Sequence, residues 1–220
     1  RDAEIEAVMR EYADPLIEAA GLDVNSVDLY LVGDVSFNAF VTGGQNVFMN
    51  TGTIILANEP IEIKGVLAHE IGHISSGHLV RFGDASRSAM ATMAATVALG
   101  VIAAIAGAAD AGAAIIASGS QFATADMLTY SRAQEAAADQ AALRFLETTG
   151  QSGIGLVRTF EALQTQDIWN NQRENLYRRS HPLSVQRVAA LQRNTTESAF
   201  YDVRDSEEEI ATLRRIQGKI

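Results

Sequence analysis

The chain has 220 residues, enough for one sizeable hydrophobic core, and with 47% hydrophobic and 20% charged residues it is neither disordered nor fibrous. Its formal net charge of −10 argues against nucleic-acid binding, which requires a basic surface. The absence of cysteine excludes disulfide frameworks, thiolate zinc sites and cysteine nucleophiles.

The first 58 residues predict one helix, three strands and a second, short helix. Apolar residues recur at helical spacing over residues 3–20, and Gly21 is a typical helix stop. Gly43 and Gly44 predict a turn between two strands, because glycine adopts backbone conformations that other residues avoid. The strands are expected at residues 27–32, 36–42 and 46–50, and the short helix at residues 51–58.

The rest of the chain is predicted to be helical. Pro60 precedes a helix expected over residues 61–80. Residues 86–125 are rich in alanine, with no charge between residues 89 and 109 or between residues 111 and 125. Asp110 and Gly112 predict a turn that makes this segment a helical hairpin. Further helices are expected at residues 130–148, 154–166, 183–193 and 206–220, the last running to residue 220 without a cap.

The main chemical motif is His69-Glu70-Ile71-Gly72-His73. Two histidines four residues apart lie on one face of a helix, so both imidazoles can reach one ion, and neutral imidazoles suit Zn²⁺. Glu70 is rotated by about 100° around the helix, which lets it face a metal-bound water as general base. The alternative is a pair of ordinary surface histidines on an amphipathic helix. Gly72 costs about 1 kcal/mol against alanine in a helix, which indicates that close packing or clearance is needed there.

A catalytic zinc site needs a third protein ligand, and Glu135 is the better candidate. Asp139 lies four residues later on the same helix face and would support that ligand from behind. Acidic residues at this spacing usually mark a solvated face, but the surrounding alanines predict a small, packable helix. His78 lies nine residues after His69, near the opposite face, and is expected to be structural.

Four motifs in order resemble the HtpX-type zinc metallopeptidases, a family that includes the CAAX prenyl endopeptidases and the periplasmic beta-barrel assembly-enhancing protease. The resemblance covers residues 38–191. The motifs are SFNAFVTGGQNVFMNTG, VLAHEIGHISSGH, YSRAQEAAADQAA and SHPLSVQRVAAL.

The resemblance implies roles for individual residues. One zinc ion per chain would be held by His69, His73 and Glu135, with Glu70 as catalytic base and Asp139 supporting a ligand. His181 would approach the zinc as an extra, inhibitory ligand, as in the soluble periplasmic branch. The implied substrate-binding residues are Asn38, Ala39 and Phe40 on the rim strand of the active-site cleft, and Arg187 near the end of the catalytic domain.

The sequence leaves two features of substrate handling open. An extended substrate is expected to pair by its main chain with a rim strand, at residues 38–41 or 46–50. A donor should stabilise the oxyanion of the reaction, and the candidates are His181, Arg187, Tyr130 and Tyr177.

The predicted architecture is α+β, a mainly helical zincin-like domain with a small sheet beside the helix of the HExxH motif. Residues 1–203 would form the catalytic domain, with the alanine-rich hairpin of residues 86–125 inserted. Residues 204–220 would begin a connecting helix that leads to a C-terminal helical-repeat domain.

The predicted function is zinc-dependent hydrolysis of peptide bonds in misfolded or unassembled cell-envelope proteins. The alternative is a chaperone or client-binding module with a latent zinc site blocked by His181. The resemblance implies the bacterial periplasm, although the chain shows no signal peptide. Polypeptide substrates are the expected partners, together with peripheral contact to a membrane or to outer-membrane assembly machinery.

Three interpretations of the alanine-rich hairpin remain. It is long enough to span a bilayer, but alanine, glycine, serine and threonine provide little insertion energy. It could otherwise pack over the catalytic domain as a helical pair, or make reversible contact with a membrane or a hydrophobic client.

Overall fold

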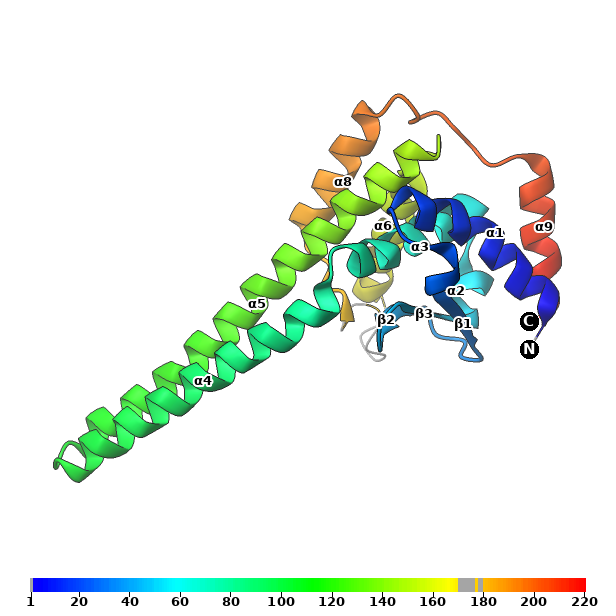
Figure 1. The fold of residues 1–220 in the computed structure, drawn as a ribbon. Helices are drawn as coiled ribbons and strands as arrows, with labels where there is room; N and C mark the ends of the chain where they lie inside the picture. Colours follow the sequence, from blue (N-terminus) through cyan, green and yellow to red (C-terminus); the bar gives the residue numbers. More distant parts are fainter. Residues whose placement is uncertain (1, 170–176, 178–179) are drawn as a thin grey trace. The chain divides into compact units, whose positions relative to one another are not determined.

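A computed structural model describes residues 2–169, 177 and 180–220, and is mainly helical with one small sheet (Figure 1). The predicted α+β fold class is confirmed. The chain forms two compact units, one of residues 1–76 with 135–220 and the other of residues 77–134. The described elements are α1 (Ala3–Ala19), η1 (Val24–Ser26), β1 (Asp28–Val32), β2 (Ala39–Thr42), β3 (Asn46–Asn50), α2 (Thr51–Leu56), α3 (Pro60–Ser75), α4 (His78–Ile105), α5 (Ala109–Thr148), α6 (Ile154–Trp169), α8 (Val185–Glu197) and α9 (Glu207–Gln217).

The sheet has the strand order β1-β3-β2, with β1 parallel and β2 antiparallel to β3. A row of stacked aromatic rings crosses one face, because Phe48 stacks on Phe40 at 5.2 Å and on Tyr30 at 5.0 Å between ring centroids. Since β3 is paired on both sides, a substrate strand cannot add to residues 46–50. Of the two expected rim strands, only β2 keeps a free edge among the described strands.

Helix α3 lies in the core of the first unit, where α1, α6, α9 and strand β2 contact it. Nearly every residue from Pro60 to His73 is buried, so α3 lacks the polar face of a surface helix. Its buried lysine, Lys64, pairs with Asp205 at 2.9 Å and with Glu209 at 2.5 Å. Residues 204–220 are therefore anchored to the first unit, and α9 buries Leu213 and Ile216. A further domain beyond them stays a prediction.

Three predicted helix limits are wrong, each for a glycine-related reason. The helix expected over residues 61–80 ends at Ser75, because Gly77 adopts a left-handed conformation with φ 65°. The hairpin turns at Gly107, with φ 89°, and not at Asp110 and Gly112. Gly112 lies inside α5, a single helix that joins the two helices expected at residues 111–125 and 130–148. Helix α9 ends at Gln217 with Gly218 as its cap, instead of running uncapped to residue 220.

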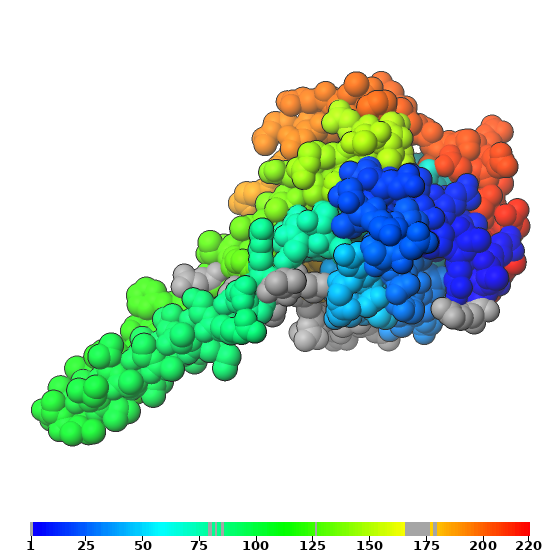
Figure 2. Space-filling model, in the orientation of Figure 1, coloured from blue at the N-terminus to red at the C-terminus, as the bar shows by residue number. Residues whose placement is uncertain are grey.

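The second unit consists of α4 and the first part of α5, up to residue 134, which run antiparallel on either side of Gly107 and form the green rod in Figure 2. Its seam is narrow. A Cβ atom added at Gly112 would lie 2.4 Å from the Gly100 carbonyl oxygen, and one added at Gly119 would lie 2.0 Å from Thr96 Oγ1. Only glycine therefore permits the two backbones to approach this closely.

Candidate metal centre

Three segments of the first unit bring four potential metal ligands together. Helix α3 supplies His69 and His73, α5 supplies Glu135, and His181 precedes α8. All four side chains are buried, and one ligand atom from each lies within 4.8 Å of the others. The predicted ligand residues, which are up to 112 positions apart in sequence, thus converge on one point.

Five of the six separations between the four ligand groups match the edges of a small tetrahedron. His69 Nε2 lies 3.1 Å from His73 Nε2 and 3.3 Å from His181 Nδ1. The Glu135 carboxylate oxygens lie 3.3 Å from His181 Nδ1, and 3.4 Å from Nε2 of His69 and of His73. A tetrahedral zinc with ligands at about 2.0–2.1 Å requires ligand atoms about 3.3–3.4 Å apart. The donor set and its spacing therefore fit one zinc ion.

Gly72 explains how α3 and α5 come close enough to share this centre. A Cβ atom at this position would lie 2.8 Å from the Ala138 carbonyl oxygen and 3.3 Å from the Ala141 Cβ. The glycine of the HExxH motif and the alanines around Glu135 thus form the contact between the two helices. The close packing expected from a glycine inside a helix is confirmed.

The centre holds more buried negative than positive charge. Glu70, Glu135 and Asp139 are carboxylates that are 0%, 3% and 5% exposed, and Arg187, 6% exposed, is the cation that pairs with two of them. Among the described residues, with the histidines taken as neutral, three negative charges and one positive charge leave the centre a net charge of −2. Uncompensated buried charge is strongly unfavourable, so this pocket of carboxylates and imidazoles is suited to a divalent cation.

Arg187 and Asp139 form a buried pair behind the ligands. The Arg187 guanidinium donates from Nε and Nη2 to the two Asp139 oxygens, each at 2.7 Å, and lies 2.9 Å from Glu135 through Nη1. Asp139 Oδ1 is 3.0 Å from His69 Nδ1, although the geometry there is not that of an aligned hydrogen bond. Asp139 thus lies where a supporting carboxylate should. The contacts of Arg187 favour a positioning role over the substrate contact expected from the sequence.

The surroundings shift the pKa values of these groups in a consistent way. Burial acts to raise the pKa of Glu135 and Asp139, but His181 and His69 beside Glu135, and Arg187 and His69 beside Asp139, outweigh it and hold both pKa values below the usual range. Burial alone would lower the pKa of His69, but the two carboxylates raise it to about 9. The electrostatics of the metal-free centre therefore favour a bound cation.

Glu70 occupies a different position from the ligands. Both of its carboxylate oxygens are buried and have no hydrogen-bond partner among the described residues, and Oε1 is 3.4 Å from His181 Nε2. Burial raises the pKa of Glu70. A buried carboxylate with unused acceptors beside a metal-ligand cluster has the position and the basicity of a general base.

Aromatic side chains enclose the histidines, and the sequence singles out one of them, Tyr177, as a candidate oxyanion donor. The Phe160 ring meets the His69 ring edge-on at 5.8 Å, and the Tyr177 ring stacks on the His181 ring at 4.6 Å. Phe37 in turn meets Tyr177 edge-on at 5.3 Å. Phe160 lies in no motif, and an isolated aromatic residue in a helix usually belongs to the core. Tyr177 is fully buried, and Tyr130 belongs to the second unit.

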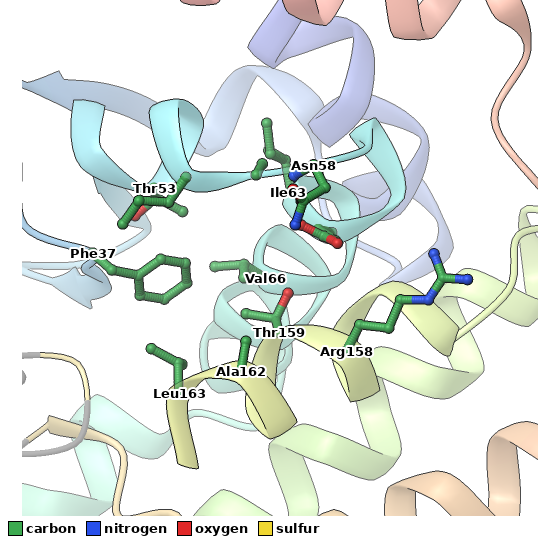
Figure 3. Close-up of a pocket in the computed structure, with 12 residues that line it drawn as sticks. Phe37, Thr53, Asn58, Ile63, Val66, Arg158, Thr159, Ala162 and Leu163 are labelled. Atoms are coloured by element: carbon green, nitrogen blue, oxygen red, sulfur yellow. Dashed lines mark hydrogen bonds between the residues drawn. The ribbon is translucent and has the colours of Figure 1, made fainter. Parts of the chain in front are cut away.

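Phe37 also lines a cavity of about 220 Å³ in the first unit (Figure 3). Val66, one turn before His69 on α3, and Leu163 of α6 make its apolar end. Asn58 and Arg158 lie at the other end of the cavity in Figure 3. The apolar end is suited to an apolar side chain of a bound peptide.

The three residues expected on the rim strand differ in how accessible their side chains are to a bound substrate. The Ala39 side chain is fully buried, and Phe40 belongs to the aromatic row on the sheet. The Asn38 main chain is held by Thr53, whose hydroxyl donates to the Asn38 carbonyl at 2.8 Å. The side-chain oxygen Oδ1 of Asn38 is buried and has no hydrogen-bond partner among the described residues. Of the three side chains, that of Asn38 offers an unused acceptor.

A model of peptidase family M48 matches residues 1–195. The chain belongs to this family. This M48 chain is 32% identical to metalloprotease YcaL of Escherichia coli over 177 aligned residues. The alignment covers 79% of this chain and 65% of the relative. It is 25% identical over 190 residues to the beta-barrel assembly-enhancing protease of Escherichia coli, covering 86% of this chain and 38% of the relative.

A Vibrio cholerae relative, named a putative beta-barrel assembly-enhancing protease, is 30% identical over 161 residues, covering 71% of this chain and 33% of the relative. The M48 chain thus spans between 33% and 65% of the length of these curated relatives. Membership of the family confirms the predicted family and enzyme class, a metalloendopeptidase.

Proposed function

We propose that the protein is a zinc-dependent metalloendopeptidase in which His69, His73 and Glu135 hold the zinc and Glu70 is the general base. The observation that carries the proposal is the convergence of four buried ligand atoms within 4.8 Å of one another, with those of His69, His73 and Glu135 3.1–3.4 Å apart. The excess of buried negative charge and the unpartnered Glu70 oxygens support it independently.

The chain's own residues would carry the proton transfers. Zinc, when bound, supplies a Lewis acid that activates water and polarises the peptide carbonyl. Glu70 takes a proton from the attacking water and delivers it to the nitrogen of the leaving amine. Asp139 and Arg187 act as positioning residues, since they fix His69 and Glu135 from behind.

The proposed substrates are misfolded or unassembled polypeptides of the cell envelope. The free edge of β2 can pair with an extended chain through main-chain hydrogen bonds, and Asn38 Oδ1 can accept a further bond. Pairing of this kind depends on the main chain of the substrate more than on its side chains, so it is suited to unfolded substrates of varied sequence. The names of two relatives refer to beta-barrel assembly, which supports the periplasm and contact with outer-membrane assembly machinery as further parts of the proposal.

One observation favours a second candidate, a client-binding protein whose zinc site is latent. His181 Nδ1 lies 3.3 Å from both His69 Nε2 and the Glu135 carboxylate, at the fourth corner of the tetrahedron. A ligand there would occupy the position that the attacking water needs. Removal of such a ligand, in His181→Ala, should raise basal proteolysis, whereas removal of a transition-state donor should lower kcat about 100-fold or more.

The domain organisation remains part of the proposal. Residues 1–203 would be catalytic, with the hairpin inserted, and residues 204–220 would lead to a C-terminal helical-repeat domain. The greater length of the relatives supports more chain around this segment.

The test of the catalytic proposal compares Glu70→Gln with a matched variant, Glu161→Gln, at an exposed position of α6. Zinc content and cleavage of unfolded casein are measured for both. Glu70→Gln should keep one zinc per chain while its activity falls by at least about 100-fold, because the base is lost and the ligands are not. Glu161→Gln should keep both properties. Full activity in zinc-loaded Glu70→Gln would refute the assignment.

A further inference from the structure

The second compact unit displays its large apolar side chains outward. Met90, Ile102 and Ile105 of α4 are 70%, 62% and 82% exposed, and Phe122 of α5 is 64% exposed. In the segment Ser86–Ile105, whose mean hydropathy is 1.9, only 6% is buried. Exposed apolar area of this extent on a soluble surface marks an interaction site.

The residues that face the partner helix are, by contrast, small. The covered positions of α4 from Ser86 onward are Ser86, Ala89, Thr92, Thr96, Gly100 and Ala103. On α5, Gly112 and Gly119 face this seam. A helical hairpin that is stable in water usually has the reverse arrangement, with large apolar residues inside and polar ones outside. Small residues between helices and large apolar ones outside are typical of helix pairs in lipid.

The outward apolar residues cover most of the circumference of α4. At about 100° per residue, Met93, Val101, Ile105, Ile102 and Leu99 are spread over about 240° of arc. A single partner helix or groove covers an apolar stripe of about 100°. One docked protein, whether a second copy of this chain or a substrate, would therefore leave much of this surface in water, whereas lipid surrounds a helix on all free sides.

The length and the charges fit the same partner. The 20 residues of Ser86–Ile105 form about 30 Å of helix, which equals the thickness of a bilayer's hydrocarbon core. No charge occurs from residue 88 to residue 109 or from residue 111 to residue 125, while Arg81, Asp84 and Arg87 lie at the base of the hairpin and Asp110 lies just after the Gly107 turn. Charged residues are thus confined to the two ends, where lipid headgroups would be.

We propose that the α4–α5 hairpin inserts into a lipid bilayer as a glycine-packed helical pair. The proposal does not depend on the metal centre. The partner that covers the apolar surface of the hairpin is lipid hydrocarbon. The experiment must distinguish this partner from a second copy of the chain and from an unfolded polypeptide.

The experiment measures flotation of the 220-residue chain with phosphatidylcholine vesicles, whose neutral headgroups exclude an electrostatic contribution. The wild-type chain should float. Ile102→Glu/Ile105→Glu should lose at least about 100-fold in vesicle partitioning, because acidic side chains insert poorly. The matched control is Val35→Glu in the first unit, since Val35 is 82% exposed, as Ile105 is, and this variant should float like wild type. Equal zinc content and helicity exclude misfolding as the cause.

A second measurement keeps the proposal testable if the glutamate variant does not fold. Because the chain has no cysteine, Leu99→Cys and Val35→Cys each accept one polarity-sensitive fluorophore. Vesicles should shift the emission to the blue at position 99 and leave it unchanged at position 35. A wild-type chain that stays with the aqueous fraction, or an unshifted probe at position 99, overturns the proposal. So does hairpin-dependent self-association or binding of unfolded casein that lipid does not compete away.

Discussion

Gly72→Ala tests whether the contact between α3 and α5 determines the metal site. The added Cβ atom would lie 2.8 Å from the Ala138 carbonyl oxygen, which is backbone and cannot rotate away. Normal contact requires about 3.4 Å or more, so the helices must separate by about half an ångström. Because His69 and Glu135 sit on opposite sides of this contact, the separation would stretch the distances between them.

The magnitude follows from two opposing effects. Alanine in place of glycine stabilises a helix by about 1 kcal/mol. Overpacking a tight contact costs about 1–3 kcal/mol, so the net change in unfolding free energy lies between zero and about 2 kcal/mol of destabilisation. Metal sites tolerate ligand displacements of only about 0.2 Å. A shift of half an ångström should therefore weaken zinc binding by about 10-fold or more, a larger effect than that on stability.

The assay combines urea unfolding of the chelated protein with competition for zinc against a coloured chelator. The matched control is Gly83→Ala in α4, where an added Cβ atom meets nothing within 4 Å. This control should gain about 1 kcal/mol in unfolding free energy and bind zinc as wild type does. If Gly72→Ala were as stable as Gly83→Ala and kept its zinc affinity, the contact could not have the role assigned to it.

Other predictions concern the buried ion pairs. Arg187→Met should destabilise the chelated protein by about 3–5 kcal/mol in urea unfolding, because two buried carboxylates lose their partner, whereas Arg193→Met on the exposed side of α8 should change it by less than about 0.5 kcal/mol. Asp139→Asn should weaken zinc binding by about 10–100-fold in chelator competition, and unchanged affinity would exclude it as a support of His69. Lys64→Met should lower the free energy of unfolding by about 3 kcal/mol, because the buried Asp205 carboxylate loses its cation. Amide hydrogen exchange in α9 should become faster, and protection equal to that of wild type would contradict the anchoring of α9.

The parts of the site that the sequence predicts are those encoded by local spacing. Two histidines four apart on a helix must share a face, and Glu135 and Asp139 must do the same, so local spacing alone is enough to recognise His69, His73 and the acidic pair. Their convergence is implied only by the family resemblance, because no local pattern tells which carboxylate, 66 residues beyond His69, reaches the same ion.

The features that the sequence predicts wrongly depend on tertiary context. Gly77 ends a helix in a left-handed conformation, whereas Gly72 and Gly100 lie inside helices, and the residue type alone does not distinguish them. The resemblance implies that Arg187 binds substrate, which stays a prediction, whereas its contacts with two carboxylates on α5 arise from packing that the sequence does not specify. The aromatic enclosure by Phe160 follows from packing of α6 on α3, which the order of elements does not specify.

The most direct test of the central claim is the zinc content of Glu135→Gln after dialysis, measured by mass spectrometry of the metal. The matched control is Glu147→Gln, on the same helix but at an exposed position. We predict one zinc per chain for wild type and Glu147→Gln, and a loss of most of the metal from Glu135→Gln, because one of three protein ligands is gone. Full zinc occupancy in Glu135→Gln, with affinity equal to that of wild type, would contradict the proposed metal centre.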